Sequence, residues 1–69
     1  METLLRAKDI SEILNVRLST VYALAHRGAI PFVRVAQGSR RSLIRFRASD
    51  LERFLREHTI PQKEELSKP

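Results

Sequence analysis

The sequence predicts one small α+β domain whose elements follow the order helix, helix, β hairpin, helix. Apolar residues recur at helical spacing in three segments, two short alternating segments lie between the second and third of these, and Asn or Gly stands at the expected turns. The chain has 69 residues, of which 42% are apolar and 30% charged. This is the composition of a globular protein with room for a single core.

The first helix is predicted over residues 7–14 by apolar residues at helical spacing. These are Ile10, Ile13 and Leu14. Asp9 lies early enough to interact favourably with the positive end of the helix dipole. Asn15 follows where the helix has to stop, and Asn tolerates the left-handed conformation that closes a helix. We therefore expect a tight turn after the first helix.

The second helix is predicted over residues 18–27, and it ends at Gly28, which suits a left-handed cap. Its apolar stripe consists of Val21, Leu24 and Ala25. The opposite face carries Ser19, Tyr22, Ala23 and His26, with Thr20 and Arg27 at its edge. We expect this polar face of small and hydrogen-bonding side chains to point outward.

Two alternating segments, residues 32–36 and 43–47, predict a two-stranded hairpin with a glycine-containing turn between them. The side chains expected to face the helices are Val33, Val35, Ile44 and Phe46. Those expected on the outer face and the tip are Phe32, Arg34, Arg45, Arg47, Arg40 and Arg41. Because an isolated hairpin is marginally stable, its inner face must share a core with the helices. The helical residues expected in that core are Ile10, Ile13, Leu14, Val21, Leu24 and Leu51.

The third helix is predicted over residues 50–57, because Ser49 and Glu52 have the spacing of a capping box before an apolar stripe. The folded domain is expected to span residues 1–58. Residues 59–69 are polar, contain two prolines and hold few large apolar side chains, so we expect them to form a mobile tail.

The basic charge of the chain is concentrated in its middle. Seven arginines and no acidic residue lie between Arg17 and Arg47, so this segment carries +7, whereas the remainder of the chain carries −2. Charge of one sign at that density attracts a polyanion. Arginine also offers a planar fork of donors that suits phosphate and guanine. Double-stranded DNA is therefore the predicted partner.

Two short helices with a tight break are typical of a helix-turn-helix, whose second helix enters the major groove of DNA. A hairpin that carries arginines at its tip is narrow enough to enter the adjacent minor groove. The sequence thus predicts a small winged helix-turn-helix. The predicted contacts of the second helix are Ser19, Thr20, Tyr22, Ala23, His26 and Arg27, and those of the wing are Arg34, Arg40, Arg41 and Arg45.

Between Leu4 and Leu55 the chain resembles the excisionase family of small winged helix-turn-helix proteins, whose fold is shared with the DNA-binding domain of MerR-type regulators. The motifs that carry the resemblance are Asp9-Ile10-Ser11-Glu12-Ile13-Leu14, Thr20-Val21-Tyr22, Arg27-Gly28, Ile30-Pro31 and Ser49-Asp50-Leu51.

The resemblance implies a recombination directionality factor: a protein without catalytic activity that binds repeated sites cooperatively, bends attachment-site DNA and directs an integrase toward excision. It also adds Arg17 to the expected recognition residues. The family usually has Ser at position 17, so the second helix here lacks that N-cap unless Ser19 caps a shorter helix. A small transcriptional regulator of a phage or mobile element remains the alternative function.

Other classes of function are disfavoured. The chain has no cysteine, its two histidines are 32 positions apart, and no serine or acid has the surroundings of a nucleophile, so we expect no metal, no cofactor and no enzyme activity. An RNA reader would display more exposed aromatic residues, and a protein adaptor stays an open alternative. The longest apolar run is far too short to cross a membrane, and no signal peptide is evident, so a cytoplasmic location is expected.

Overall fold

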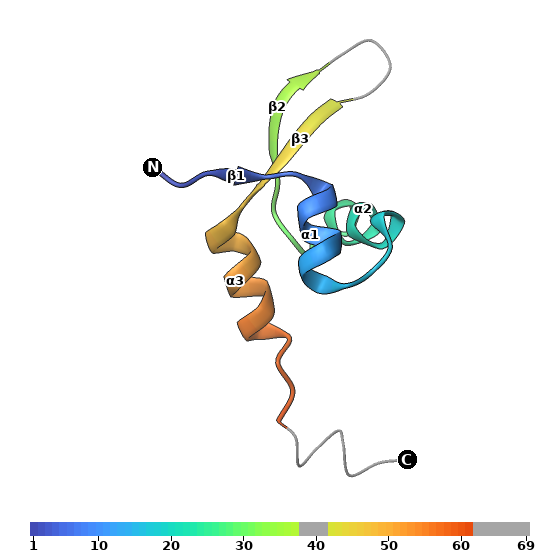
Figure 1. Cartoon of the computed structure of the whole chain (residues 1–69), viewed down its shortest axis with the longest axis vertical. Helices are drawn as coiled ribbons and strands as arrows, with labels where there is room; N and C mark the ends of the chain where they lie inside the picture. The colour runs from blue at the N-terminus through green and yellow to red at the C-terminus, as the bar shows by residue number, and fades with distance from the viewer. Residues whose placement is uncertain (38–41, 62–69) are drawn as a thin grey trace.

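Six elements follow one another in the computed structural model, which describes residues 1–37 and 42–61 (Figure 1). They are β1 (Leu4–Leu5), α1 (Ala7–Leu14), α2 (Leu18–His26), β2 (Val33–Gln37), β3 (Ser42–Arg47) and α3 (Ala48–Glu57). The predicted winged helix-turn-helix is therefore confirmed. The predicted hairpin turn with Arg40 and Arg41, and residues 62–69 of the predicted tail, lie outside the described residues.

Both predicted turns around α2 use a left-handed residue. Asn15 has a φ of 57°, and its N–H and that of Val16 both donate to the carbonyl of Ser11. Gly28 has a φ of 80° after α2, where Ala29 N–H donates to the carbonyl of Leu24. These bonds satisfy helix carbonyls that would otherwise lack partners. The chain can therefore reverse sharply at each end of α2.

The sheet has three antiparallel strands in the order β1-β3-β2, with β3 in the centre. In β1, Leu4 lies opposite Arg47 and Leu5 opposite Phe46. The sequence predicted only the two-stranded hairpin, because two residues are too few to show strand alternation. Figure 1 shows the hairpin extending beyond the helices, with α1 and α2 on one side of β3 and α3 at its opposite end.

The face of β2 that meets the helices differs from the predicted one. Arg34 lies opposite Ile44, and residues directly opposite in a sheet share a face, so Arg34 is on the core side with Ile44. A bulge between Arg34 and Ala36 leaves Val35 52% exposed. The prediction that Val35 faces inward is therefore wrong, and Arg34 shares a face with Ile44 although its side chain remains exposed. The periodicity of a strand gives two faces but does not say which one is buried.

Seven apolar residues form the core where the helices meet β3: Ala7, Ile10, Val21, Ala25, Ile30, Phe46 and Leu51. Five apolar residues pack around them: Leu5, Leu14, Leu24, Ile44 and Phe54. Ile13 was predicted to be in the core but is 55% exposed. Ile30 is completely buried although it lies in the connection between α2 and β2, where no periodic pattern marks it.

The start of α3 corrects the predicted capping box. The helix begins at Ala48, so Ser49 is inside its first turn. The backbone N–H and the hydroxyl of Ser49 each donate to a carboxylate oxygen of Glu2, both at 3.0 Å. Glu2 thus satisfies a free N–H of the helix from 47 residues away. Nothing in the local sequence around Ser49 indicates this partner.

Candidate nucleic-acid interface

The outward face of α2 is the first part of the candidate interface. Val21 and Ala25 anchor the helix in the core, which leaves the opposite face free. The exposed residues on and beside this face are Ser19, Thr20, Tyr22, Ala23, His26 and Arg27. The predicted orientation of the helix is confirmed. Ser19, Thr20 and Ala23 are small, so this part of the face is slim enough to lie in a major groove.

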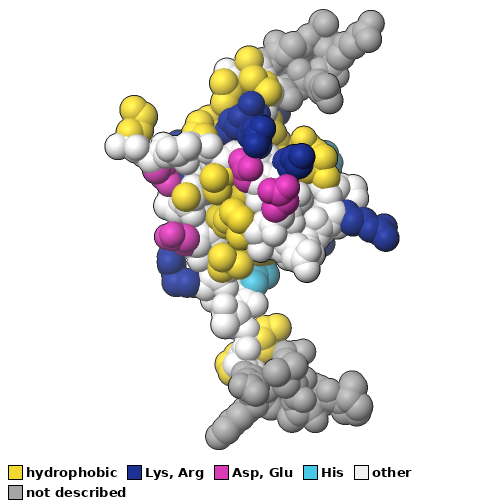
Figure 2. Space-filling view, in the orientation of Figure 1, with side chains coloured by type: hydrophobic (Ala, Val, Ile, Leu, Met, Phe, Trp, Pro, Cys, Tyr) yellow, Lys and Arg dark blue, Asp and Glu magenta, His cyan; other side chains and the backbone are white. Residues whose placement is uncertain are grey.

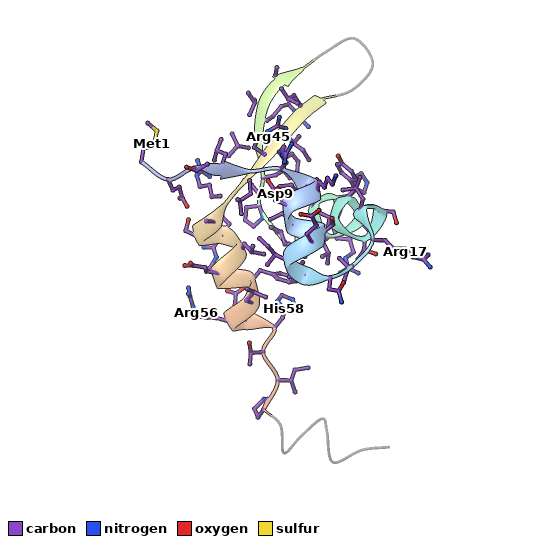
Figure 3. All side chains as sticks on the ribbon, in the orientation of Figure 1. Met1, Asp9, Arg17, Arg45, Arg56 and His58 are labelled. Atoms are coloured by element: carbon purple, nitrogen blue, oxygen red, sulfur yellow. The ribbon has the colours of Figure 1, made fainter. Side chains whose placement is uncertain are left out.

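The N-terminal end of α2 has no side-chain cap. Arg17 is the N-cap residue, and none of its side-chain atoms bonds the helix. Its carbonyl accepts the N–H groups of Thr20 and Val21. The Arg17 side chain projects away from the molecule at this end of the helix (Figure 3). A shorter helix capped by Ser19 is not formed, so the uncapped start expected from Arg17 is confirmed.

A hollow of about 260 Å³ separates α2 from the hairpin, and we call it the aromatic hollow. It is lined by Tyr22, Ala25, His26, Phe32, Arg34 and Ile44. The Arg34 guanidinium carbon lies 5.9 Å from the centre of the Phe32 ring, within the range of a cation–π contact. Arg34 therefore lies beside the outward face of α2, in the hollow that Tyr22 and His26 also line.

A second hollow, also about 260 Å³, lies on the other side of Tyr22, and we call it the basic hollow. It is lined by Arg6, Ala7, Lys8, Leu18, Tyr22, Leu43, Ile44 and Arg45. Arg45 was expected on the outer face of the hairpin and lies half-buried here, where its Nη1 donates to the carbonyl of Ile44 at 2.7 Å. Arg6 and Lys8 are not among the predicted site residues, since no local pattern in the sequence links the start of α1 to β3.

Asp9 is an acidic residue paired with Arg6, which lines the basic hollow. It accepts the backbone N–H of Arg6 at 2.9 Å and pairs with the Arg6 guanidinium at 3.4 Å. The pKa of Asp9 is lowered, first by the bond from the Arg6 backbone, then by the Arg6 side chain, and also by the charge of Arg45. Figure 3 shows Asp9 beside Arg45, where α1 meets β3.

The arginines between Arg17 and Arg47 do not all belong to one surface. Arg47 pairs with Asp50 of α3 at 3.8 Å, and Arg53 pairs with the same carboxylate at 3.0 Å. Arg47 is therefore balanced by an acid from outside the central segment. The view in Figure 2 likewise shows a face on which cations, acids and apolar side chains are mixed. Among the described residues, Arg17, Arg27, Arg34 and Arg45, which lie on or beside α2 and the hairpin strands, form no ion pair within 4.0 Å.

The fold thus brings together only part of the predicted site. Tyr22, His26 and Arg34 line the aromatic hollow, and Tyr22 and Arg45 line the basic one. Arg17 and Arg27 stand at opposite ends of α2. Two further predicted residues, Arg40 and Arg41, belong to the part of the hairpin that the structure does not describe.

Within residues 1–37 and 42–61, no cluster of three His, Asp or Glu side chains is arranged to hold a metal ion. In the same part of the chain, the helices are all too short or too polar to cross a lipid bilayer.

Two helices with a tight turn, a slim outward face on the second helix and an adjoining hairpin define the class: a winged helix-turn-helix domain. The family model described as a helix-turn-helix domain matches residues 4–59, so the chain belongs to that family. The family consists of DNA-binding domains and includes small excisionase-like proteins. No curated protein and no solved structure matches the chain at a significant level.

Proposed function

We propose that the protein binds double-stranded DNA sequence-specifically, with α2 in the major groove and the β2–β3 hairpin against the adjacent minor groove. The observation that carries the proposal is the exposed outward face of α2, which no other described element covers. Burying Val21 and Ala25 fixes this face relative to the hairpin. The two grooves of one duplex can then be contacted by a single rigid domain.

The contacts of α2 follow from the reach of each side chain. Ser19 and Thr20 donate to base edges or phosphates near the start of the helix, and the methyl group of Ala23 packs against a thymine methyl. Tyr22 and His26 are long enough to reach a phosphate or a base. Arg17 and Arg27, at the two ends of the helix, bind the phosphate backbone on either side of the groove.

The wing contacts divide into two sets. Arg34 and Arg45 belong to the base of the hairpin, close to α2, and bind phosphates where the two grooves meet. Arg40 and Arg41 belong to the turn and enter the minor groove, where the negative potential favours guanidinium groups. About five phosphate contacts in total give a log–log salt slope near −4.5 for duplex DNA.

The biological role we propose is that of an excisionase, which bends attachment-site DNA and directs an integrase toward excision. The support for it is the resemblance between Leu4 and Leu55 and the membership of excisionase-like proteins in the family. In this role the partners are DNA, a site-specific integrase and further copies of the chain bound cooperatively at adjacent sites.

Footprinting of DNA beside the gene, with and without the neighbouring recombinase, tests this role. Repeated adjacent footprints near an attachment core support excision, whereas one palindromic footprint over a promoter supports a transcriptional regulator. In the same assay Ser19→Ala should reduce the ratio of specific to random binding, because a phosphate contact alone cannot discriminate sequences. An equal loss on both kinds of DNA would exclude Ser19 from base recognition.

A further inference from the structure

The basic hollow gathers cations from three parts of the chain that are distant in sequence. Arg6 precedes α1, Lys8 is in its first turn, and Arg45 comes from β3, while Tyr22 of α2 also lines the hollow. Arg6 and Lys8 belong to neither the recognition helix nor the wing. The predicted DNA contacts therefore do not account for them.

The charges in this hollow do not cancel. Three cations line the hollow, and Asp9 pairs with one of them, Arg6. This pair is open to solvent, with 63% of the Arg6 side chain exposed. That pair uses Nε and one terminal nitrogen of Arg6 and leaves other guanidinium donors free. Arg45 uses Nη1 on the carbonyl of Ile44 and likewise retains donors. The hollow thus has an excess of about two positive charges and several hydrogen-bond donors for an anion.

The rest of the lining is apolar and consists of Ala7, Leu18, Leu43 and Ile44. An inorganic anion gains nothing from such walls. A sugar–phosphate backbone does, because the carbon atoms of each deoxyribose pack against apolar surface while the phosphate reaches the cations. The combination of apolar walls and cations at the rim therefore favours a phosphodiester over free phosphate.

The position of the hollow matches this chemistry. Its lining includes Leu18 and Tyr22 from α2 and Leu43, Ile44 and Arg45 from β3, so it lies where these two elements approach each other. If α2 occupies the major groove and the hairpin the neighbouring minor groove, the DNA strand that separates the two grooves must pass between these elements. The strand then crosses the hollow.

We propose that the basic hollow binds a phosphate of the DNA strand that separates the two grooves, through Arg6, Lys8 and Arg45, with Tyr22 packing against the adjoining sugar. This inference rests on the proposed DNA binding and adds a third contact surface, contributed by α1. Asp9 orients Arg6 for this contact through its two guanidinium bonds.

The test compares two single variants that each remove one positive charge. Lys8→Gln removes charge from the hollow at a residue that is not among the proposed wing contacts, whereas Arg56→Gln removes it from α3, where the Arg56 side chain projects away from the hollow (Figure 3). Arg6 is kept because it also completes the start of α1 with Asp9. Circular dichroism and thermal unfolding of both variants establish that they fold.

Binding to a short random-sequence duplex is then measured as a function of salt concentration. The hollow variant should flatten the log–log slope by roughly 0.9 for each phosphate that it no longer neutralises, and the α3 variant should leave the slope unchanged. If the original protein binds DNA and the two variants have equal slopes, whether both are flattened or neither is, the assignment of the hollow is overturned. If the unchanged protein binds no duplex, the proposed function itself fails.

A second experiment distinguishes binding of a DNA strand from binding of a free anion. Amide NMR shifts of Lys8 and Tyr22 are followed during titration with inorganic phosphate, with chloride at equal ionic strength as the reference. We expect saturable shifts with duplex DNA only. Saturable binding of inorganic phosphate, combined with an unchanged DNA salt slope in the hollow variant, would identify a small-anion site and contradict the proposal.

Discussion

Two isoleucines on α1 give a matched test of where the core lies. Ile10 is completely buried at the centre of the cluster that includes Val21 and Phe46, whereas Ile13, three residues later, is 55% exposed. Both belong to the same apolar pattern, and both are replaced by alanine in the test. Any difference in stability between Ile10→Ala and Ile13→Ala therefore reports burial and not helix propensity.

The expected magnitudes follow from burial. Removing the Ile10 side chain leaves a cavity among helices and sheet and should cost about 2–5 kcal/mol. At Ile13 the destabilisation should stay near the ±0.5 kcal/mol typical of surface positions, because the better helix propensity of Ala offsets part of the reduced packing. A domain of this length has a free energy of unfolding of roughly 3–10 kcal/mol, so Ile10→Ala removes a large share of it.

Thermal and urea unfolding followed by circular dichroism measure both variants. For a domain of this size each kcal/mol lowers Tm by about 4–8 °C, so Ile10→Ala should lower Tm by at least about 8 °C. Ile13→Ala should remain within a few degrees of the unchanged protein. Similar decreases for the two variants would refute the placement of α1 against the core.

Two further predictions concern the ends of helices. The hydrogen bonds that Glu2 accepts from the backbone N–H and the hydroxyl of Ser49 lower the pKa of the Glu2 carboxyl below its ordinary value of 4.5. The stability that these bonds contribute is therefore fully present above pH 4.5. It is lost as the pH falls through the lower pKa of the folded state. Glu2→Gln should therefore flatten the fall of Tm below pH 4.5, and an unchanged pH profile would rule out the bond in solution. At Asn15, with its φ of 57°, Ala should cost about 1 kcal/mol while Gly is tolerated. Chemical denaturation compares the two, and Ala as stable as Gly would contradict the left-handed turn.

Local signals were sufficient for α1, for α2 and for the turns at Asn15 and Gly28. Residues 7–14 were predicted as a helix with the bounds that α1 has, and Asn15 and Gly28 were predicted as the residues that end α1 and α2. Each of these predictions depends on the conformational preference of one residue or on spacing within a few turns. Such preferences act at short range, so the sequence expresses them directly.

Contacts between distant segments were not accessible in the same way. β1 is two residues long, Glu2 meets Ser49 across 47 positions, and the bulge in β2 shifts Val35 to the surface. A strand pattern leaves open which face is buried until the partner strand fixes the register. The predicted capping box at Ser49 was wrong because a side chain from the N-terminus occupies that role.

The amino-acid sequence by itself determined the order of helices and hairpin, the outward face of α2 and the concentration of arginine in the middle of the chain, because spacing, turn chemistry and charge are properties of neighbouring residues. Only the tertiary structure decided that Arg34 faces α2, that Asp50 balances Arg47, and that Arg6 and Lys8 join Arg45 in one hollow. These outcomes depend on how helices pack on a sheet of fixed register, which brings together side chains that no local pattern connects.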